Sequence, residues 1–492
     1  MTSQANDDDI RALAKGGKTN VLGFILRLAG RIPFLFIAGR LYGPDAMGRF
    51  AFALAVVEFA VQLCTLGQKR GLAQELAREE RHPAHVVADG MLLSAVLAAA
   101  VGIILYLVPI VVFPSGQHTE LERLIPAMMV PMVLTDIALS AQAYRFDVAT
   151  TVRSRAIVEP WVLSILAAAL WFVVPDSGLI LAYIGSVFAA AVTALWPVVR
   201  TYGLPRNWHP HPLLLGQLAI ANLPLAIADA IEWGTRRLDV MILGVFASPT
   251  AVGVYYAVQQ IASIPQKFKT SFDPVLGPVI TRNLKDGNHL AISQQVRQVG
   301  YWIIATQIGV ALALGITGEG VMGLTGPEFV PGAGALIVLL AAEVIASTAA
   351  VSEAALIYVN RVQNMLVSLA TLGLQIVFSV VLILLARRIG LNEYYWAAAV
   401  AGGLGLALGF SSIAKSWLLG RFLDQPTNPW RVGLVWGLGP AALLGWFFTR
   451  LTPEWAELAL GIPVILVVYA FGIWHKGFGP EDRVLFRKNV GG

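Results

Sequence analysis

Charged residues are scarce in this sequence, and their scarcity excludes most classes of soluble protein. Only 13% of the 492 residues are Asp, Glu, Lys or Arg, whereas an ordinary soluble domain has about 25%. Hydrophobic residues make up 57%, and the mean hydropathy is +0.69. Because this excess runs from end to end, the composition excludes both a water-soluble globular enzyme and a soluble domain with a single membrane anchor.

Cysteine is nearly absent from the sequence, and the common catalytic motifs are lacking. The one cysteine, Cys64, excludes an intramolecular disulfide. No HExxH, Walker loop or nucleophile elbow occurs. The glycines of GGLGLALG (402–409) follow no strand pattern, so they indicate helix packing, and His209 and His211 lack the spacing of a zinc site. We therefore expect no catalytic residue, metal or cofactor.

A cleavable signal and a nucleic-acid-binding patch are not indicated either. The first 17 residues are polar and lack an apolar core with a cleavage site, so the first hydrophobic run is expected to stay in the fold. The net charge of +5 and the pI near 9.3 are compatible with nucleic acid, but the basic residues are scattered singly between apolar runs rather than clustered on one face. We expect no nucleic-acid partner.

Long apolar runs occupy most of the chain. A spanning helix needs about 20 apolar residues, and its backbone must satisfy its own hydrogen bonds in lipid. The sequence therefore predicts an all-α integral membrane protein of about fourteen transmembrane helices, without room for a soluble domain. The predicted spans are 18–41, 46–68, 87–113, 123–143, 156–174, 178–199, 223–246, 249–274, 298–317, 333–358, 362–386, 394–419, 430–449 and 455–474.

The basic residues predict the orientation of these spans. Of the 35 Lys and Arg, 25, with Lys415 among them, fall in the tails and the loops on the side of the N-terminus, and six fall on the opposite side. Cytoplasmic loops carry the excess of Lys and Arg. We therefore expect a multi-pass protein of the cytoplasmic (inner) membrane with both termini in the cytoplasm. The remaining four basic residues lie within spans and are Arg27, Arg31, Arg236 and Arg237.

An internal repeat divides the chain. A shift of 205 residues aligns 31–53 with 236–258 without a gap, with six identities in 23 positions. Both copies run from the inner to the outer side, so the repeat predicts two pseudo-symmetric lobes around a central cavity, related by an axis along the membrane normal. The identities are Arg31/Arg236, Ile37/Ile242, Gly39/Gly244, Pro44/Pro249, Ala46/Ala251 and Gly48/Gly253. The expected parts are a cytoplasmic segment (1–17), an N-terminal lobe of six helices (18–206), a C-terminal lobe of six helices (207–421), and two additional helices with a cytoplasmic tail (422–492).

Three segments carry a resemblance to a known family. They are GRLYGPDAMGRFAFAL (39–54), LDVMILGVFASPTAVGVYYAVQQIASIP (238–265) and TGPEFVPGAGALIVLL (325–340). The chain resembles the polysaccharide-export branch of the multidrug/oligosaccharidyl-lipid/polysaccharide exporter superfamily, the flippases of polyprenyl-diphosphate-linked oligosaccharides. The resemblance implies a two-lobed helical bundle whose cationic cavity opens alternately to the two sides, and it implies no catalysis.

Two arginines of the first span are expected near the bilayer midplane. Arg27 and Arg31 lie roughly 14 and 20 Å into a hydrocarbon core of about 30 Å. They share a helix face with small and polar residues, which favours a cavity over lipid contact. With Arg236, the repeat equivalent of Arg31, they are expected to bind a diphosphate headgroup. The alternative is that they extend to an interface or form structural ion pairs.

The seventh predicted span carries a stripe of charge. Asp229, Glu232 and Arg236 lie along one face with Asp239 at its edge. Asp229 or Glu232 is the expected ion-coupling site, because a carboxylate that exchanges a proton between two exposures can couple transport to a gradient. The alternative is an intrahelical Glu232 to Arg236 pair. We expect a structural role for Arg237.

Further charges lie singly in the spans or at their inner ends. Glu58, Asp136, Glu343 and Glu353 are each expected to be either coupling groups or hydrogen-bonded packing residues. At the inner mouth, the basic residues occupy matched places in the two repeat copies. Capture of a diphosphate explains them as well as headgroup anchoring or the plain positive-inside bias does. These residues are Lys69, Arg70, Lys267 and Lys269.

Three functions compete. The first is a flippase of a lipid-linked oligosaccharide that works by alternating access in polysaccharide or lipopolysaccharide biosynthesis. Its expected partners are its substrate, membrane lipids, and polysaccharide polymerase and export proteins. The second is an ion-coupled exporter of small amphipathic cations, which the surplus of intramembrane acids keeps open. The third is a membrane glycan polymerase or ligase, which the short outer loops disfavour. The sequence thus favours a carrier, not an enzyme.

Overall fold

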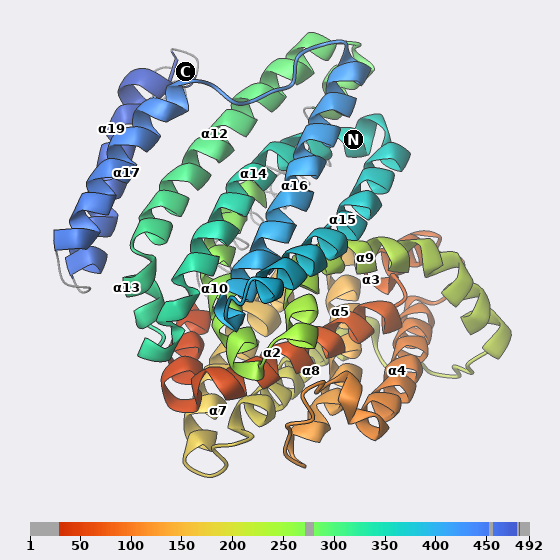
Figure 1. Ribbon diagram of the computed structural model, residues 1–492. Coiled ribbons are helices and arrows are strands. Elements are labelled where there is room, and N and C mark those ends of the chain that lie inside the picture. Colours follow the sequence, from red (N-terminus) through yellow and green to blue (C-terminus); the bar gives the residue numbers. More distant parts are fainter. Residues whose placement is uncertain (1–28, 271–279, 452–455, 480–481, 483–492) are drawn as a thin grey trace. The chain divides into compact units, whose positions relative to one another are not determined.

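The computed structural model describes residues 29–270, 280–451, 456–479 and 482, and Figure 1 shows that most of them are helical. No strand occurs in these described ranges. The chain forms two compact units, Met1–Gly253 and Val254–Gly492, and each is described separately below. The all-α architecture predicted from the apolar runs is confirmed. The lobe boundaries expected from the repeat stay a prediction.

Unit 1 is built from α-helices with short 3-10 and π-helical segments between them. A helix that is present from residue 29 continues into the first of these elements. The elements are η1 (Ala38–Tyr42), α2 (Gly43–Cys64), α3 (Gln68–Ala77), α4 (Pro83–Leu107), η2 (Pro109–Val111), η3 (Glu122–Met128), α5 (Met129–Tyr144), α6 (Val148–Thr151), η4 (Val152–Val158), α7 (Glu159–Trp171), α8 (Gly178–Tyr202) and α9 (Pro212–Phe246). Helix α10 (Pro249–Thr270) begins in unit 1 and continues into unit 2.

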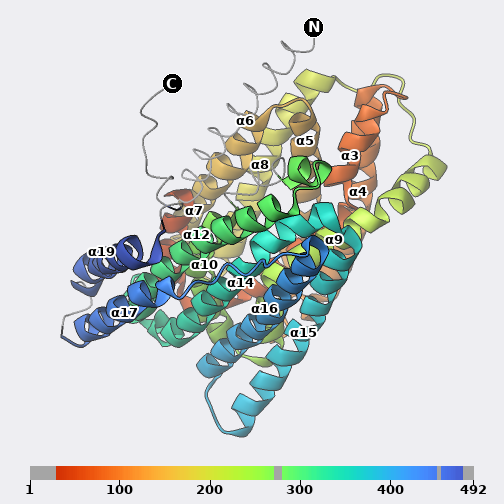
Figure 2. The ribbon, with the colours of Figure 1, turned by 90° about the horizontal axis from the view of Figure 1, so that it is seen from above.

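Unit 2 is built from long helices. Helices α14, α15 and α16 pack against one another, and α17 packs on α19, as Figures 1 and 2 both show. Asparagine side chains cap three of the long helices, because Asn288, Asn360 and Asn392 each accept a hydrogen bond from a backbone N–H of the first turn. The elements are α12 (His289–Ile316), α13 (Gly318–Gly323), η5 (Pro327–Gly332), α14 (Ala333–Val359), α15 (Arg361–Arg388), α16 (Glu393–Leu423), α17 (Gly433–Leu451), η6 (Glu457–Gly461), α19 (Ile462–Gly472) and η7 (Ile473–Gly477).

Twelve described stretches are long and apolar enough to cross a membrane. One of them, Ala29–Ala77, includes the described part of the predicted span 18–41 and the whole of the predicted span 46–68. The described part of the predicted span 249–274 forms α10, which is not among the twelve. The chain is therefore a multi-pass membrane protein, and the predicted count of fourteen is approximate.

Gly43 separates the first two predicted spans. Its φ of 76° lies in the left-handed region, and Pro44 follows in the first turn of α2. Glycine adopts this conformation without steric cost, and proline fits a first helical turn because that position needs no N–H partner. The uninterrupted helical stretch is thus two segments joined at a Gly-Pro step.

The two copies of the sequence repeat meet at close quarters inside unit 1. A Cβ on Gly48 of α2 would lie 1.7 Å from the carbonyl oxygen of Pro249, and a Cβ on Gly253 would lie 1.9 Å from that of Pro44. The contact is reciprocal between repeat-related residues, as expected for segments related by a local two-fold axis. Only glycine permits this approach of two backbones.

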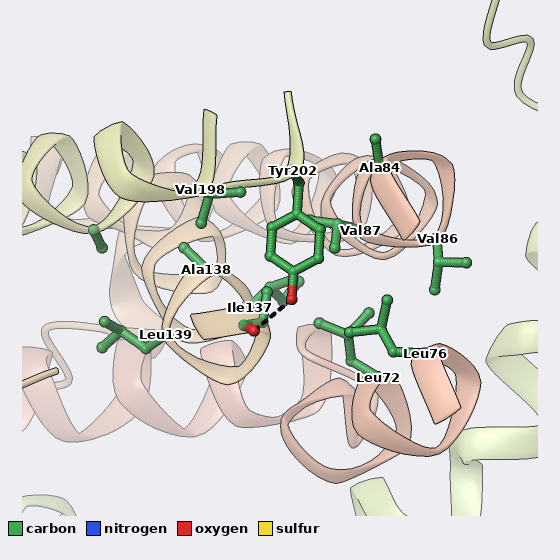
Figure 3. Close-up of a cluster of buried hydrophobic side chains, with 12 residues drawn as sticks. Leu72, Leu76, Ala84, Val86, Val87, Ile137, Ala138, Leu139, Val198 and Tyr202 are labelled. Atoms are coloured by element: carbon green, nitrogen blue, oxygen red, sulfur yellow. Dashed lines mark hydrogen bonds between the residues drawn. The ribbon is translucent and has the colours of Figure 1, made fainter. Parts of the chain in front are cut away.

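A hydrophobic cluster from α3, α4, α5 and α8 forms part of the core of unit 1 (Figure 3). Leu72 and Ile137 are almost fully buried in it. The Tyr202 hydroxyl at the end of α8 donates a hydrogen bond of 2.6 Å to the carbonyl oxygen of Ala141. This cluster fixes α3 against α5, which positions the charged residues at the start of α3.

Candidate functional site

A tight turn places two basic residues at the start of α3. After α2 ends at Cys64, Leu66 and Gly67 adopt positive φ angles of 48° and 64°, and α3 begins at the next residue. Lys69 and Arg70 therefore lie in the first turn of α3, not at the end of the second span as the sequence suggested. A Cβ on Gly67 would lie 2.5 Å from Cβ of Leu225, so glycine also permits the approach of α9.

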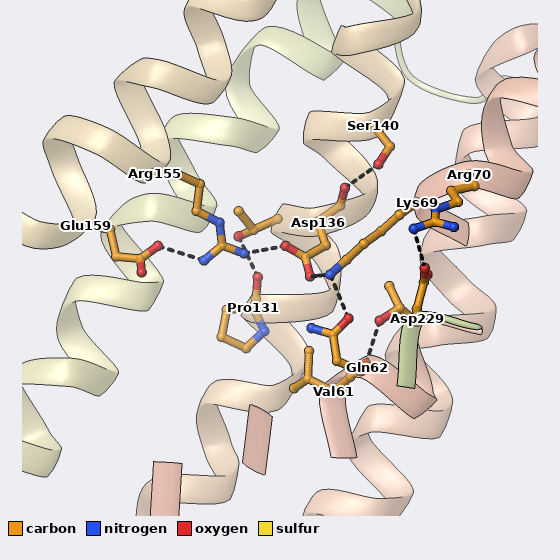
Figure 4. A network of polar contacts seen from close by, with 12 residues as sticks. Val61, Gln62, Lys69, Arg70, Pro131, Asp136, Ser140, Arg155, Glu159 and Asp229 are labelled. Carbon is orange, nitrogen blue, oxygen red and sulfur yellow. Dashed lines mark hydrogen bonds and ion pairs between the residues drawn. The ribbon is translucent and has the colours of Figure 1, made fainter. Parts of the chain in front are cut away.

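Lys69 joins α3 to α5. Its Nζ lies 2.9 Å from Oδ2 of Asp136 and donates a hydrogen bond of 2.9 Å to Oε1 of Gln62 (Figure 4). The side chains of Lys69 and Asp136 are 31% and 13% exposed. The lysine is thus paired in a largely desolvated position, where an uncompensated charge is costly.

Arg155 completes the environment of the same carboxylate. It projects from the π-helical turn η4, donates to Oδ1 of Asp136, and donates a second hydrogen bond of 2.7 Å to Oε2 of Glu159 in α7. Two cations from different elements therefore share Asp136 (Figure 4). Single-turn π-helices often occur at functional positions of helical proteins.

Arg70 points the opposite way, toward α9. Its Nη2 lies 3.0 Å from Oε2 of Glu232 and 3.4 Å from Oδ1 of Asp229. Arg70 and Glu232 are half exposed, whereas the Asp229 side chain is only 10% exposed. Asn222, on the same face of α9, packs against Gly71 of α3. Asp229 and Glu232 of the predicted stripe therefore face α3 within unit 1.

These contacts form one cluster, which we call the unit-1 charge network. It has a buried part around Asp136 and a half-exposed part around Arg70. Exposed ion pairs contribute about 0 to 1 kcal/mol, whereas removal of one partner from a buried pair costs about 3 to 5 kcal/mol. The buried part therefore holds helices together, and the exposed part is free to exchange partners. The members are Lys69, Arg70, Asp136, Arg155, Glu159, Asp229 and Glu232.

Two further charges of α9 also lie within unit 1. The Nε of Arg237 is 3.7 Å from Oε2 of Glu58 in α2, so this pair links α9 to α2. The Trp233 ring lies 5.3 Å from that of Phe59. Asp239 is 1% exposed, and its carboxylate accepts a hydrogen bond of 2.9 Å from the backbone N–H of Val240. The structural role expected for Arg237 stays a prediction.

The two candidate acids of unit 2, Glu343 and Glu353, lie on α14. Glu353 is 3.0 Å from Nζ of Lys415 on α16, and this ammonium also donates to Oγ of Ser368 on α15 at 3.1 Å. Lys415 is 3% exposed, although the charge count grouped it with the inner loops. That grouping was wrong, because Lys415 lies within α16, as the predicted span 394–419 indicates, and forms a buried link between three helices. Glu343 is 4% exposed.

The remaining predicted site residues are described only in part. Arg27 lies outside the described residues, and so do the side chains of Arg236, Lys267 and Lys269. Arg31 is exposed on the helix that leads into α2. The expected midplane arginine cluster therefore stays a prediction.

Sequence reasoning missed Arg155 and Glu159 as site residues. The first was grouped with the inner loops, and the second was not considered. Their i, i+4 spacing at the start of an apolar run was a usable signal, because such pairs meet on one helix face. No comparable signal in the sequence links Arg155 to Asp136.

The chemistry of the network suits an anionic ligand. Arg70 presents a guanidinium of which half is exposed, held by two carboxylates of another helix. Guanidinium groups bind phosphate oxygens through paired, charge-assisted hydrogen bonds. A phosphate that reaches Arg70 would compete with Asp229 and Glu232 and release them.

Comparison with known proteins supports a transporter fold. The structure is similar to the lipid II flippase MurJ in an inward closed conformation, with a TM-score of 0.73 and 10% identity over 95% of this chain and 100% of that one. It is similar to an inward-facing multidrug resistance transporter of the MATE family, with a TM-score of 0.65 and 12% identity over 81% and 94%. A related transporter from Pyrococcus furiosus has a TM-score of 0.56 and 13% identity over 84% and 95%.

Comparison at the level of sequence gives the family. Among curated proteins, no match to this chain was found. Residues 19–284, more than half of the chain, match the family described as polysaccharide biosynthesis protein. Because it covers more than half of the chain, this match shows that the chain belongs to the polysaccharide biosynthesis protein family.

Proposed function

We propose that this protein is a flippase that carries a polyprenyl-diphosphate-linked oligosaccharide across the cytoplasmic membrane by alternating access, for polysaccharide or lipopolysaccharide biosynthesis. Family membership and the likeness to a solved lipid II flippase support a carrier of lipid-linked glycans. The observation that carries the proposal is the half-exposed Arg70, held by Asp229 and Glu232 across α3 and α9.

Arg70 acts as a switchable anion site in this proposal. Without substrate, the carboxylates of Asp229 and Glu232 pair with the guanidinium. When a diphosphate binds Arg70, it displaces these carboxylates from the guanidinium, and they take up a proton or a cation. This uptake offsets the negative charge that the diphosphate brings to the site. Substrate binding and ion uptake are thereby coupled at one residue.

The other basic residues would act in sequence along the path. Arg70, Lys267 and Lys269 would form the cytoplasmic entrance. Arg27, Arg31 and Arg236 then replace water around the phosphates halfway across, where an unpaired anion is costly. The buried pair of Lys69 with Asp136 supports the position of α3 rather than contacting substrate first.

The fold likeness to a multidrug transporter keeps a cation exporter as the alternative. Such a carrier needs acids that are available to a cationic substrate. In the described part of unit 1, Glu58, Asp136, Asp229 and Glu232 each face a basic residue. This pairing favours an anionic substrate.

The proposal is tested by replacing Arg70 in cells that depend on this protein for glycan export. Arg70→Gln is expected to reduce export about tenfold or more and to make lipid-linked glycan accumulate in the cytoplasmic leaflet, because one charge-assisted contact to phosphate is lost. Arg78→Gln is the matched control, since Arg78 pairs with Glu75 at the exposed end of the same helix. Normal export by Arg70→Gln at normal protein level would refute the role of Arg70.

The coupling is tested with the two carboxylates. Asp229→Asn and Glu232→Gln keep the shape of the side chains but remove the exchangeable charge. We expect both variants to be produced normally and the double variant to lose the dependence of transport on an ion gradient. If gradient dependence is unchanged, Asp229 and Glu232 only hold Arg70 in place.

Export of a cationic dye by the wild type, without glycan export, would favour the multidrug function instead.

A further inference from the structure

An apolar groove of about 650 Å³ lies on unit 2, apart from the charged residues discussed above. Helices α14 and α16 form its walls, and the segment 425–430 that follows α16 closes one end. The volume falls in the range of small-molecule sites, about 300 to 1,000 Å³. Gly409 lies at the far end, where an added Cβ would meet only Cγ2 of Ile345, at 3.8 Å.

Three hydrogen-bonding groups of the groove are satisfied internally. Ser412 donates to the carbonyl oxygen of Ile345, and the indole N–H of Trp430 donates to Oγ1 of Thr348, both at 2.8 Å. Thr427 donates at 2.8 Å to the carbonyl oxygen of Ser416. These groups need no water, so the walls offer an apolar surface to a ligand.

A cationic and aromatic rim marks the closed end. Arg421 lies in the last turn of α16, with its guanidinium carbon 5.5 Å from the ring centre of Trp417. Trp417 and Trp430 are 59% and 44% exposed. Within the described chain, Arg421 forms no ion pair, although Asp424 follows three residues later. Tryptophan and arginine at a helix end are typical of the headgroup level of a membrane.

The length of the groove is close to the hydrocarbon thickness of one membrane leaflet. Arg421 and Gly409 are both on α16 and twelve residues apart, which corresponds to about 18 Å along the helix. Half of the hydrocarbon core is about 15 Å thick. A ligand with its phosphate at Arg421 and an acyl chain along the groove would therefore reach from the headgroup level to about the midplane. The positive-inside pattern puts this end in the cytoplasmic leaflet.

We propose that this groove binds an anionic phospholipid of the cytoplasmic leaflet, with one acyl chain along α14 and α16 and the phosphate on the Arg421 guanidinium. The single cation matches one phosphodiester charge rather than a diphosphate. The site binds lipid of the bulk membrane whatever the protein transports, so its test is independent of the proposed function.

The test uses the purified full chain in detergent, with bound lipid counted by native mass spectrometry. We expect phosphatidylglycerol to bind more tightly than phosphatidylcholine. Arg421→Gln should weaken phosphatidylglycerol binding about tenfold, since a charge-assisted contact to phosphate is removed. Gly409→Phe should weaken both lipids, because the ring fills the groove.

Matched controls separate the groove from general effects. Arg200 stacks on Trp196 with the same i, i+4 spacing on α8, and Gly373 on α15 is exposed with no atom within 4 Å of an added Cβ. Arg200→Gln and Gly373→Phe should bind lipid as the wild type does. Equal binding in all five proteins would overturn the proposal. Preference for a polyprenyl phosphate over phosphatidylglycerol would assign the groove to the tail of a substrate instead.

Discussion

Asp136 is the carboxylate on which the buried part of the unit-1 charge network depends. It receives Lys69 from α3 and Arg155 from η4, and its side chain is 13% exposed. Removing a shared anion leaves two cations without compensation in a poorly hydrated place. A large part of the energetic cost of substituting Asp136 therefore comes from Lys69 and Arg155, which remain charged without their counter-charge.

We expect Asp136→Ala to lower the free energy of unfolding by about 3 to 5 kcal/mol, as for other broken buried ion pairs. Glu75→Ala is the matched control, because it removes only an exposed pair with Arg78 and should cost about 1 kcal/mol or less. Denaturant titration of the purified protein in detergent measures both values. Equal values for the two variants would contradict the buried role of Asp136.

The arginines of the first span give a second prediction at this scale. Bidentate contact with phosphate is specific to guanidinium, so lysine should substitute poorly. Arg27→Ala, Arg31→Ala and the two lysine replacements should each cause lipid-linked glycan to accumulate in the cytoplasmic leaflet at normal protein level. The readout is the fraction of lipid-linked glycan accessible from outside. Full export by the double alanine variant would exclude the proposed midplane cluster.

At the scale of elements, the crossing of α2 with the first turn of α10 leaves no space for a side chain. Gly48 and Gly253 each lie against a proline carbonyl oxygen of the other segment. Backbone atoms cannot move aside as a flexible side chain does, so the helices must separate to admit a methyl group. The glycine and the proline that this contact requires occur at matching positions in both copies of the repeat.

We therefore expect Gly48→Ala and Gly253→Ala each to lower the melting temperature of the purified protein by several degrees, the shift that about 1 to 3 kcal/mol of overpacking produces. Gly216→Ala on α9 is the control, since an added Cβ there meets no atom within 4 Å. It should be neutral or stabilising by about 0.5 to 1 kcal/mol, because alanine favours the helix. Unchanged melting of both repeat glycine variants would show that the crossing is loosely packed.

At the scale of the whole molecule, the order of spans predicts which loops face outside. Reporter fusions placed after Asp176 and after Gly320 should report the outer side, and a fusion after Arg206 the cytoplasm. Asp176 lies between α7 and α8, and Arg206 lies between α8 and α9. Enzymatic reporters active on one side only would measure this. A cytoplasmic signal after Asp176 or Gly320 would contradict the predicted number of spans.

The sequence alone determined the class of the protein and the positions of most helices. Hydropathy suffices for this, because each spanning helix must be apolar over its own length and satisfies its backbone internally. Local signals also sufficed where two residues share a helix face, as for Asp229 and Glu232, or where one span ends and the next begins, as between residues 41 and 46. Such features depend on neighbours within a few residues.

Only the tertiary structure decided which charges meet. Lys69 pairs with Asp136 and Arg70 with Asp229 and Glu232, over separations of 67, 159 and 162 residues. Lys415, which the charge count grouped with the inner loops, is buried between α14, α15 and α16. Composition cannot predict these partners, because many acids and bases satisfy the same hydropathy pattern. The packing of helices selects one set, since a buried charge is stable only where a counter-charge is within reach.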